Sequence, residues 1–177
     1  CLLRRQRQMC IRDSSKTATG EVVVDGGTLT AATINLGHKN NQNSSAIDNS
    51  YTSTGTLTVN SGSVTFTNAL VMAHSDDSVG TFTINDGDVT ARGLTFGTKD
   101  STSHDYTNQV ANFNLLGGEV NVTAGGWINW DDDATVERNV VIGAGLLTLT
   151  NQVTSTGYNG KLGSIRNLIN HLMADSN

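Results

Sequence analysis

A twelve-residue pattern of alternating apolar and polar positions recurs five times along the chain. Its clearest copy, residues 55–66, reads Gly-Thr-Leu-Thr-Val-Asn-Ser-Gly-Ser-Val-Thr-Phe. The copies begin at Gly20, Gly55, Gly80, Ala111 and Arg138. Apolar residues occupy the third, fifth, tenth and twelfth positions of every copy, and most positions between them are polar. Internal repetition of this kind indicates the architecture before any local propensity is considered.

Each copy predicts two short strands that meet at a glycine. Apolar residues two positions apart are typical of a half-buried strand, and every copy has one such pair on each side of its eighth position. That eighth position is always glycine, which accepts a positive φ without steric cost. The predicted structural turn glycines are therefore Gly27, Gly62, Gly87, Gly118 and Gly145.

A third apolar pair follows in the first three copies and predicts a third strand. The pairs are Ile34 with Leu36, Leu70 with Met72, and Leu94 with Phe96. In the fourth copy the pair is blurred, because Trp127, Ile128 and Trp130 all compete for the two positions.

Two arrangements can use such strands: antiparallel hairpins that turn at each glycine, or a solenoid whose strands pair in parallel one repeat later. The copies start 25 to 35 residues apart, and the extra length always follows the third strand, at 37–54, 73–79, 97–110 and 131–137. Stacked coils tolerate insertions at one corner. The pattern therefore favours an all-β fold, a three-faced parallel β-helix of about five coils over residues 20–150. Phe82 and Phe113 share a position in the repeat and are expected to stack in its core.

The two ends of the chain differ from the repeats. Residues 1–14 contain both cysteines and four of the eleven basic residues, and the string resembles translated sequencing-adapter sequence. We therefore interpret residues 1–19 as a non-native or disordered leader, and residues 1–14 contribute nothing to the predicted fold. In residues 151–177, apolar residues three and four apart between Ile165 and Met173 predict a short helix that caps the last coil.

The charge of the repeats limits the classes of partner. Beyond residue 14 the chain has 7 basic and 15 acidic residues, a net charge of −8. Nucleic acid and anionic membrane surfaces are poor partners for such a chain. No stretch reaches the roughly 20 apolar residues of a membrane-spanning helix, so we do not expect the chain to insert in a membrane.

Acidic residues gather in the segments that follow the third strands: Asp76, Asp77, Asp100, Asp105, Asp131, Asp132 and Asp133. Stacked carboxylates offer the oxygen ligands that calcium prefers, and paired acids serve polysaccharide-degrading enzymes. The calcium-binding nonapeptide is missing from the sequence. A solvated acidic rim is the simplest interpretation, with no cofactor, and calcium is the alternative.

Two further groups of residues suggest chemistry. His38 and His74 follow the third strand at matching positions of copies one and two, but no third ligand or His-x-x-x-His spacing accompanies them, so we interpret them as exposed loop residues rather than a metal pair. Trp127 and Trp130 beside Asp131 and Asp132 form the one cluster of aromatic and acidic residues. Core filling by the tryptophans is the favoured interpretation, and contact with glycans is the alternative. No catalytic or phosphate-binding motif occurs.

The cadence of residues 55–66 resembles the repeats of bacterial autotransporter passengers and of secreted proteins with PEP-CTERM-type sorting tags. The resemblance covers about residues 20–150. It implies a parallel, usually right-handed β-solenoid located outside the cell or on its surface, with a structural or adhesive role and surface glycans or surface proteins as partners. Pectate-lyase-like enzymes share this fold, so the alternative is a carbohydrate-binding or polysaccharide-degrading module. We interpret the chain as a non-enzymatic fragment of a surface protein.

Overall fold

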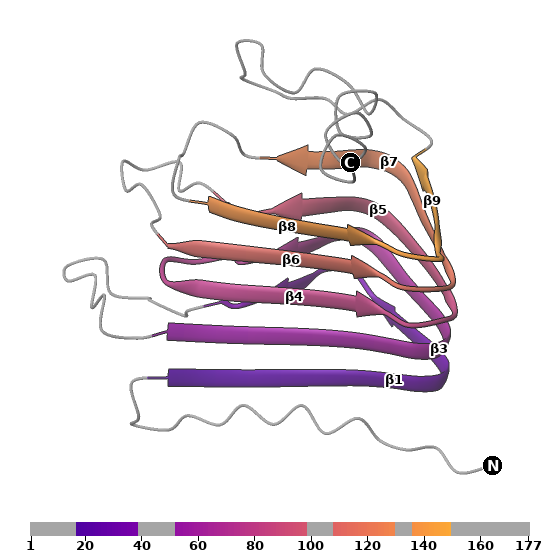
Figure 1. Cartoon of the computed structure of the whole chain (residues 1–177), viewed down its shortest axis with the longest axis horizontal. Helices are drawn as coiled ribbons and strands as arrows, with labels where there is room; N and C mark the ends of the chain where they lie inside the picture. The colour runs from indigo at the N-terminus through magenta and orange to yellow at the C-terminus, as the bar shows by residue number, and fades with distance from the viewer. Residues whose placement is uncertain (1–16, 39–51, 99–107, 130–135, 150–177) are drawn as a thin grey trace.

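The fold is all β in a computed structural model that describes residues 17–38, 52–98, 108–129 and 136–149, with the backbone alone described for 124–129. These residues contain no helix; they form nine strands that belong to one curled sheet (Figure 1). The strands are β1 (Thr17–Ala31), β2 (Ile34–Leu36), β3 (Thr52–Met72), β4 (Ser78–Ile84), β5 (Asp88–Phe96), β6 (Gln109–Leu115), β7 (Glu119–Asn129), β8 (Val136–Ile142) and β9 (Leu146–Leu149).

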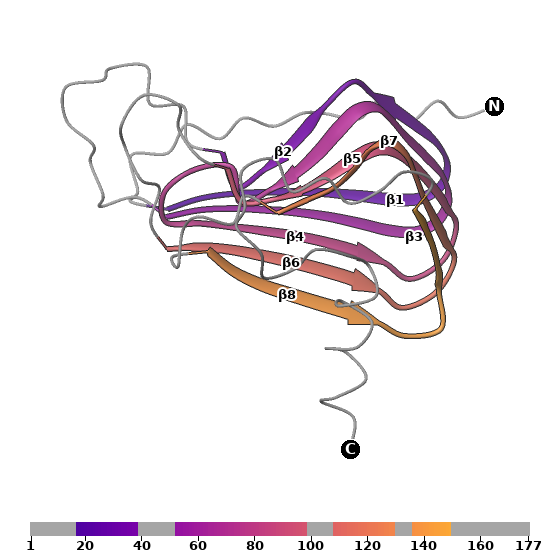
Figure 2. The same cartoon turned by 90° about the horizontal axis from the view of Figure 1, so that it is seen from above.

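The strand pairings form three parallel ladders. In the first ladder the order is β1, β3, β4, β6, β8. In the second, the later part of β1 pairs with β3, then β5, β7 and β9 follow. The third joins β2 to the ends of β3, β5 and β7. Seen from above, the ladders curve around a common interior and give the sheet the form of a half-barrel (Figure 2).

The register of the first ladder follows the sequence repeat without a slip. Gly20 pairs with Gly55, Gly55 with Gly80, Gly80 with Ala111, and Ala111 with Arg138. The predicted parallel pairing of each strand with its counterpart one repeat later is thus confirmed. No pairing in the described residues is antiparallel, which rules out hairpins at Gly62 and Gly87. A one-residue slip would turn every apolar side chain outwards, so burial of one face fixes this register.

The core consists of the predicted inward positions. In copies two to four, the third, fifth, tenth and twelfth positions are at most 1% exposed, whereas those of the first and last copies are covered less completely. Phe82 and Phe113 stack with ring centroids 5.8 Å apart, as predicted. Phe66 and Phe96 extend this stack edge-to-face, each with a centroid separation of 6.3 Å from its neighbour.

Two columns of left-handed backbone turn the chain from one ladder to the next. The first consists of the turn glycines, with φ of 80° at Gly27, 94° at Gly62, 99° at Gly87 and 71° at Gly118; Gly145 does not have a positive φ. The second column follows the third ladder and consists of Gly37, Ala73 and Gly97, with φ of 70°, 58° and 75°. Alanine rarely adopts this conformation, so Ala73 shows that the corner imposes it.

The structure differs in part from two of the sequence predictions, the extent of the leader and the third strand of the fourth copy. β1 begins at Thr17 and pairs with β3 from Thr52 onwards, so the sheet includes the last three residues of the segment interpreted as a leader. In the fourth copy, the register places Trp127 opposite Leu94 and Asn129 opposite Phe96. Residues 1–16 and the predicted capping helix at 165–173 lie outside the described residues.

Candidate functional site

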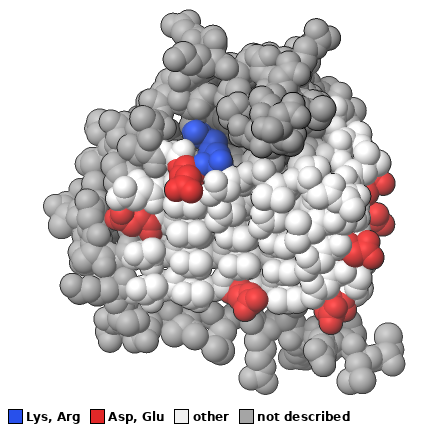
Figure 3. All heavy atoms as spheres, in the orientation of Figure 1, with Lys and Arg blue, Asp and Glu red and all other residues white. Residues whose placement is uncertain are grey.

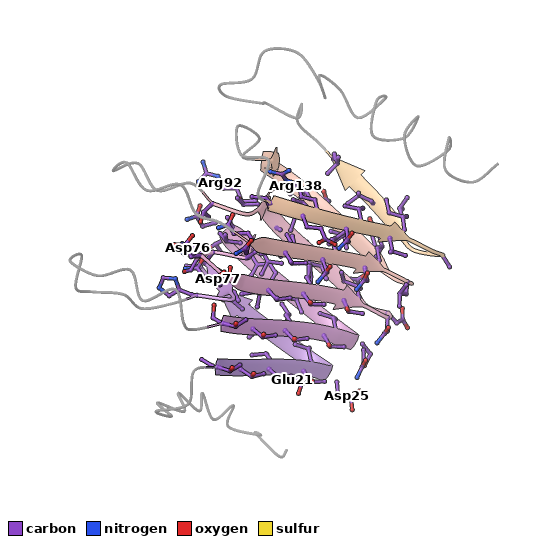
Figure 4. All side chains as sticks on the ribbon, turned by 60° about the vertical axis from the view of Figure 1, so that its left-hand side comes forward. Glu21, Asp25, Asp76, Asp77, Arg92 and Arg138 are labelled. Atoms are coloured by element: carbon purple, nitrogen blue, oxygen red, sulfur yellow. The ribbon has the colours of Figure 1, made fainter. Side chains whose placement is uncertain are left out.

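Polar and titratable side chains collect at the corner where the third ladder ends and the first begins. This corner, which we call the loop corner, carries His38 after β2, the segment 73–77 between β3 and β4, and Thr98 after β5. The described segments that flank residues 39–51, 99–107 and 130–135 also end and begin at this corner (Figure 1). Asp76 and Asp77 lie on this side, whereas Asp25 lies at the opposite end of the first ladder (Figure 4).

The loop corner brings His38 and His74 into direct contact. Their Nδ1 atoms are 2.9 Å apart, and their rings meet edge-to-face with centroids 4.5 Å apart and planes at 85°. The ladder causes this contact, because Leu36 pairs with Met72 and a left-handed residue follows each of them. The sequence suggested two independent, exposed loop residues, but the histidines are in contact. His38 is exposed, and His74 is half-buried.

The backbone of His74 is held on both sides by neighbouring ladder positions. Its N–H donates to the Leu36 carbonyl oxygen at 3.2 Å, and its own carbonyl accepts from the Thr98 hydroxyl at 2.7 Å. Ser75 Oγ lies 3.4 Å from His38 Nδ1. These contacts hold the backbone of His74 in place beside His38.

Both histidines favour the neutral form. Burial lowers the pKa of His38 from its ordinary value of 6.5. Burial is also the larger cause that lowers the pKa of His74, and the charge that His38 would carry adds to it. Neutral imidazoles have one protonated and one free ring nitrogen, so a hydrogen bond between the Nδ1 atoms requires different tautomers in the two rings.

This pair predicts a loss of stability in mild acid. Since the folded-state pKa values lie below 6.5, the unfolded chain binds more protons as the pH falls through about 6.5. The contribution of the pair is complete above about pH 7.5, and it is lost as the pH falls from there towards the lowered pKa values. We expect urea denaturation between pH 5.5 and 7.5 to show this slope. A His38→Ala/His74→Ala double variant with an unchanged slope would contradict the prediction.

Buried polar groups reinforce the corner beside the histidines. Ser75 N–H donates to Ser78 Oγ at 3.2 Å, and the Ser78 hydroxyl donates back to the Ser75 carbonyl. The Gln109 side chain is fully buried: its Oε1 accepts from the Thr98 N–H at 3.3 Å, and its Nε2 donates to the Thr98 carbonyl at 3.2 Å. These bonds replace backbone partners that the irregular corner lacks, so their role is structural.

The acidic residues of the corner have structural contacts in the described part. Asp76 is 7% exposed, and Asp77 Oδ1 accepts from Asn108 Nδ2 at 2.8 Å. Across the described ranges, no group of three or more His, Cys, Asp or Glu side chains is arranged to hold a metal ion. The other acids of the predicted calcium column, Asp100, Asp105 and Asp131 to Asp133, lie outside the described residues, so calcium binding stays a prediction.

The predicted glycan-contact cluster falls mostly beyond the described structure. The backbone of Trp127 pairs with Leu94 in the third ladder, but its side chain is not described. Trp130, Asp131 and Asp132 lie outside the described residues.

The matching positions of His38 and His74 in the repeat were a sequence signal for their contact. No sequence signal identified the buried amide of Gln109.

No protein-family model, curated protein or solved structure matches the chain. No helix among the described residues is long and apolar enough to cross a membrane.

Proposed function

We propose that this chain is part of an extracellular or bacterial cell-surface β-solenoid with a structural or adhesive role. We also propose that the solenoid is a right-handed parallel β-helix of about five coils. The observation that carries it is the uninterrupted register of the first ladder, in which each repeat stacks on the previous one. In repeat architectures each unit is stabilised by its neighbours, which suits a rigid rod.

The outer face of the first ladder supports a scaffold role. Its side chains are mostly threonine and asparagine, and they bond to one another between neighbouring strands. Asn112 Nδ2 donates to Thr81 Oγ1 at 3.1 Å, Asn114 Nδ2 to Thr83 Oγ1 at 3.2 Å, and Asn139 Nδ2 to Asn112 Oδ1 at 3.0 Å. This face is broad and largely uncharged, with the acidic groups towards its margins (Figure 3). Side chains paired in this way stabilise the exterior of the first ladder, which suits a scaffold.

The loop corner supports a display role. The segments that join successive repeats there differ in length, and the ladders on either side keep one register. A surface protein can vary such segments while its scaffold stays unchanged, because loops tolerate insertions better than ladders do. This arrangement supports the proposal that the protein adheres through the loop corner.

The test compares adhesion with catalysis by the full chain. Beads coated with the protein are expected to adhere to a subset of surfaces coated with glycans or extracellular proteins. Acidic polysaccharides are expected to remain intact, as measured by the absorbance of unsaturated sugars. Release of unsaturated sugars that is abolished by Asp131→Ala or Asp132→Ala, but not by Asp25→Ala, would establish the enzymatic alternative.

Glycan binding has its own outcome in the same assay. Specific affinity for a glycan that is lost in Trp127→Ala or Trp130→Ala would assign the chain to carbohydrate-binding modules rather than to scaffolds. Absence of adhesion to every surface would reject the adhesive role. A left-handed winding of the coils would overturn the proposed architecture.

A further inference from the structure

The His38–His74 pair has the geometry of a two-ligand metal site. The two Nδ1 atoms face each other at 2.9 Å from neighbouring levels of the third ladder. Histidine nitrogen binds zinc at about 2.0–2.1 Å. Two bonds of that length place the nitrogens about 2.9 Å apart at a right angle and about 3.4 Å apart at the tetrahedral angle. The observed separation therefore accommodates a metal ion after at most a small outward movement of the exposed His38 ring.

The surroundings favour ligation over an isolated histidine contact. The backbone of His74 is fixed by Leu36 and Thr98, which holds one ligand in place. The other ligand, His38, is exposed, so one side of the pair is open to solvent and to additional water ligands.

We propose that His38 and His74 bind one divalent transition-metal ion of the zinc, nickel or copper class through their Nδ1 atoms. Imidazole nitrogen selects these ions, whereas calcium and magnesium require oxygen ligands. Among the described residues no third His, Cys, Asp or Glu side chain joins the pair, and we take water to occupy the remaining coordination positions. The ion connects two levels of the sheet across 36 residues of chain and so stabilises the folded state.

The test titrates the full, tag-free chain with zinc chloride at pH 7.5 by isothermal calorimetry. Every sample carries Cys1→Ser and Cys10→Ser, because cysteine thiolates also bind zinc. We expect one site whose affinity falls at least tenfold in His38→Ala and in His74→Ala. His171→Ala is the matched control and is expected to leave the affinity unchanged. The melting temperature should rise by about 5–10 °C at a zinc concentration a hundredfold above the dissociation constant.

Nitrogen-15 NMR of the imidazoles distinguishes the proposed site from a simple hydrogen bond. With zinc, both His38 and His74 are expected to carry their proton on Nε2 and the metal on Nδ1. Three results would overturn the proposal: no zinc binding, a control variant that loses as much affinity as His38→Ala, or zinc bound to Nε2 with the proton on Nδ1. Far-UV circular dichroism of each variant checks that the sheet persists.

Discussion

Phe82→Ala is expected to lower the free energy of unfolding by about 3–5 kcal/mol, because it removes one of the two inner rings of the four-ring core stack. Phe82 is fully buried, and its ring contacts Phe66 on one side and Phe113 on the other. The surrounding backbone is held by ladders on both sides of β4, so the cavity cannot collapse easily. The measurement is the urea denaturation midpoint followed by circular dichroism.

The matched control for this substitution is Thr58→Ala, which changes an outward position of the neighbouring strand β3. Its effect is expected to stay within about 0.5 kcal/mol, as is usual for surface positions. A midpoint for Phe82→Ala close to that of the unsubstituted chain would mean that the third position of the repeat does not support the core.

Gly62→Ala is expected to cost about 2–5 kcal/mol, and Gly27→Ala only about 1–2 kcal/mol. Both residues have a positive φ, so both substitutions introduce the strain of an L-residue in left-handed backbone. They differ in their contacts. A Cβ on Gly27 would meet nothing within 4 Å, whereas a Cβ on Gly62 would overlap the Gly27 carbonyl oxygen and lie 2.9 Å from the carbonyl carbon of Gly26.

The difference between the two variants therefore measures the cost of separating two stacked turns, about 1–3 kcal/mol. Chemical denaturation of both variants under the same conditions gives this difference directly. Equal costs would show that the glycine is required for its φ alone, and that the stacked backbone moves apart freely.

The fold was predictable because one period governs all of its determinants. Apolar positions, turn glycines and the site of insertions recur together, so a single register satisfies every copy. The second left-handed column was not predicted, because Ala73 breaks the glycine pattern of Gly37 and Gly97 and the following segments differ in length. The left-handed conformation of Ala73 is imposed by its place in the stack between Gly37 and Gly97, which is a tertiary effect.

The candidate site was less predictable than the fold. The matching positions of His38 and His74 were visible in the sequence, but their contact depends on side-chain directions set by the corner. The burial of Gln109 and its two bonds to Thr98 depend on how β6 approaches the end of β5. The contact between Gln109 and Thr98 joins residues whose relation is not periodic, so the repeat does not reveal it.

The parallel ladders also determine how the protein responds to force. Their hydrogen bonds point along the stacking direction, so a load that separates β1 from β8 acts on one level of bonds at a time. Such a load releases the repeats one after another. Each released repeat of 25 to 35 residues lengthens the chain by roughly 85–120 Å. A metal ion between His38 and His74 would hold the first two levels together and delay the release of the first.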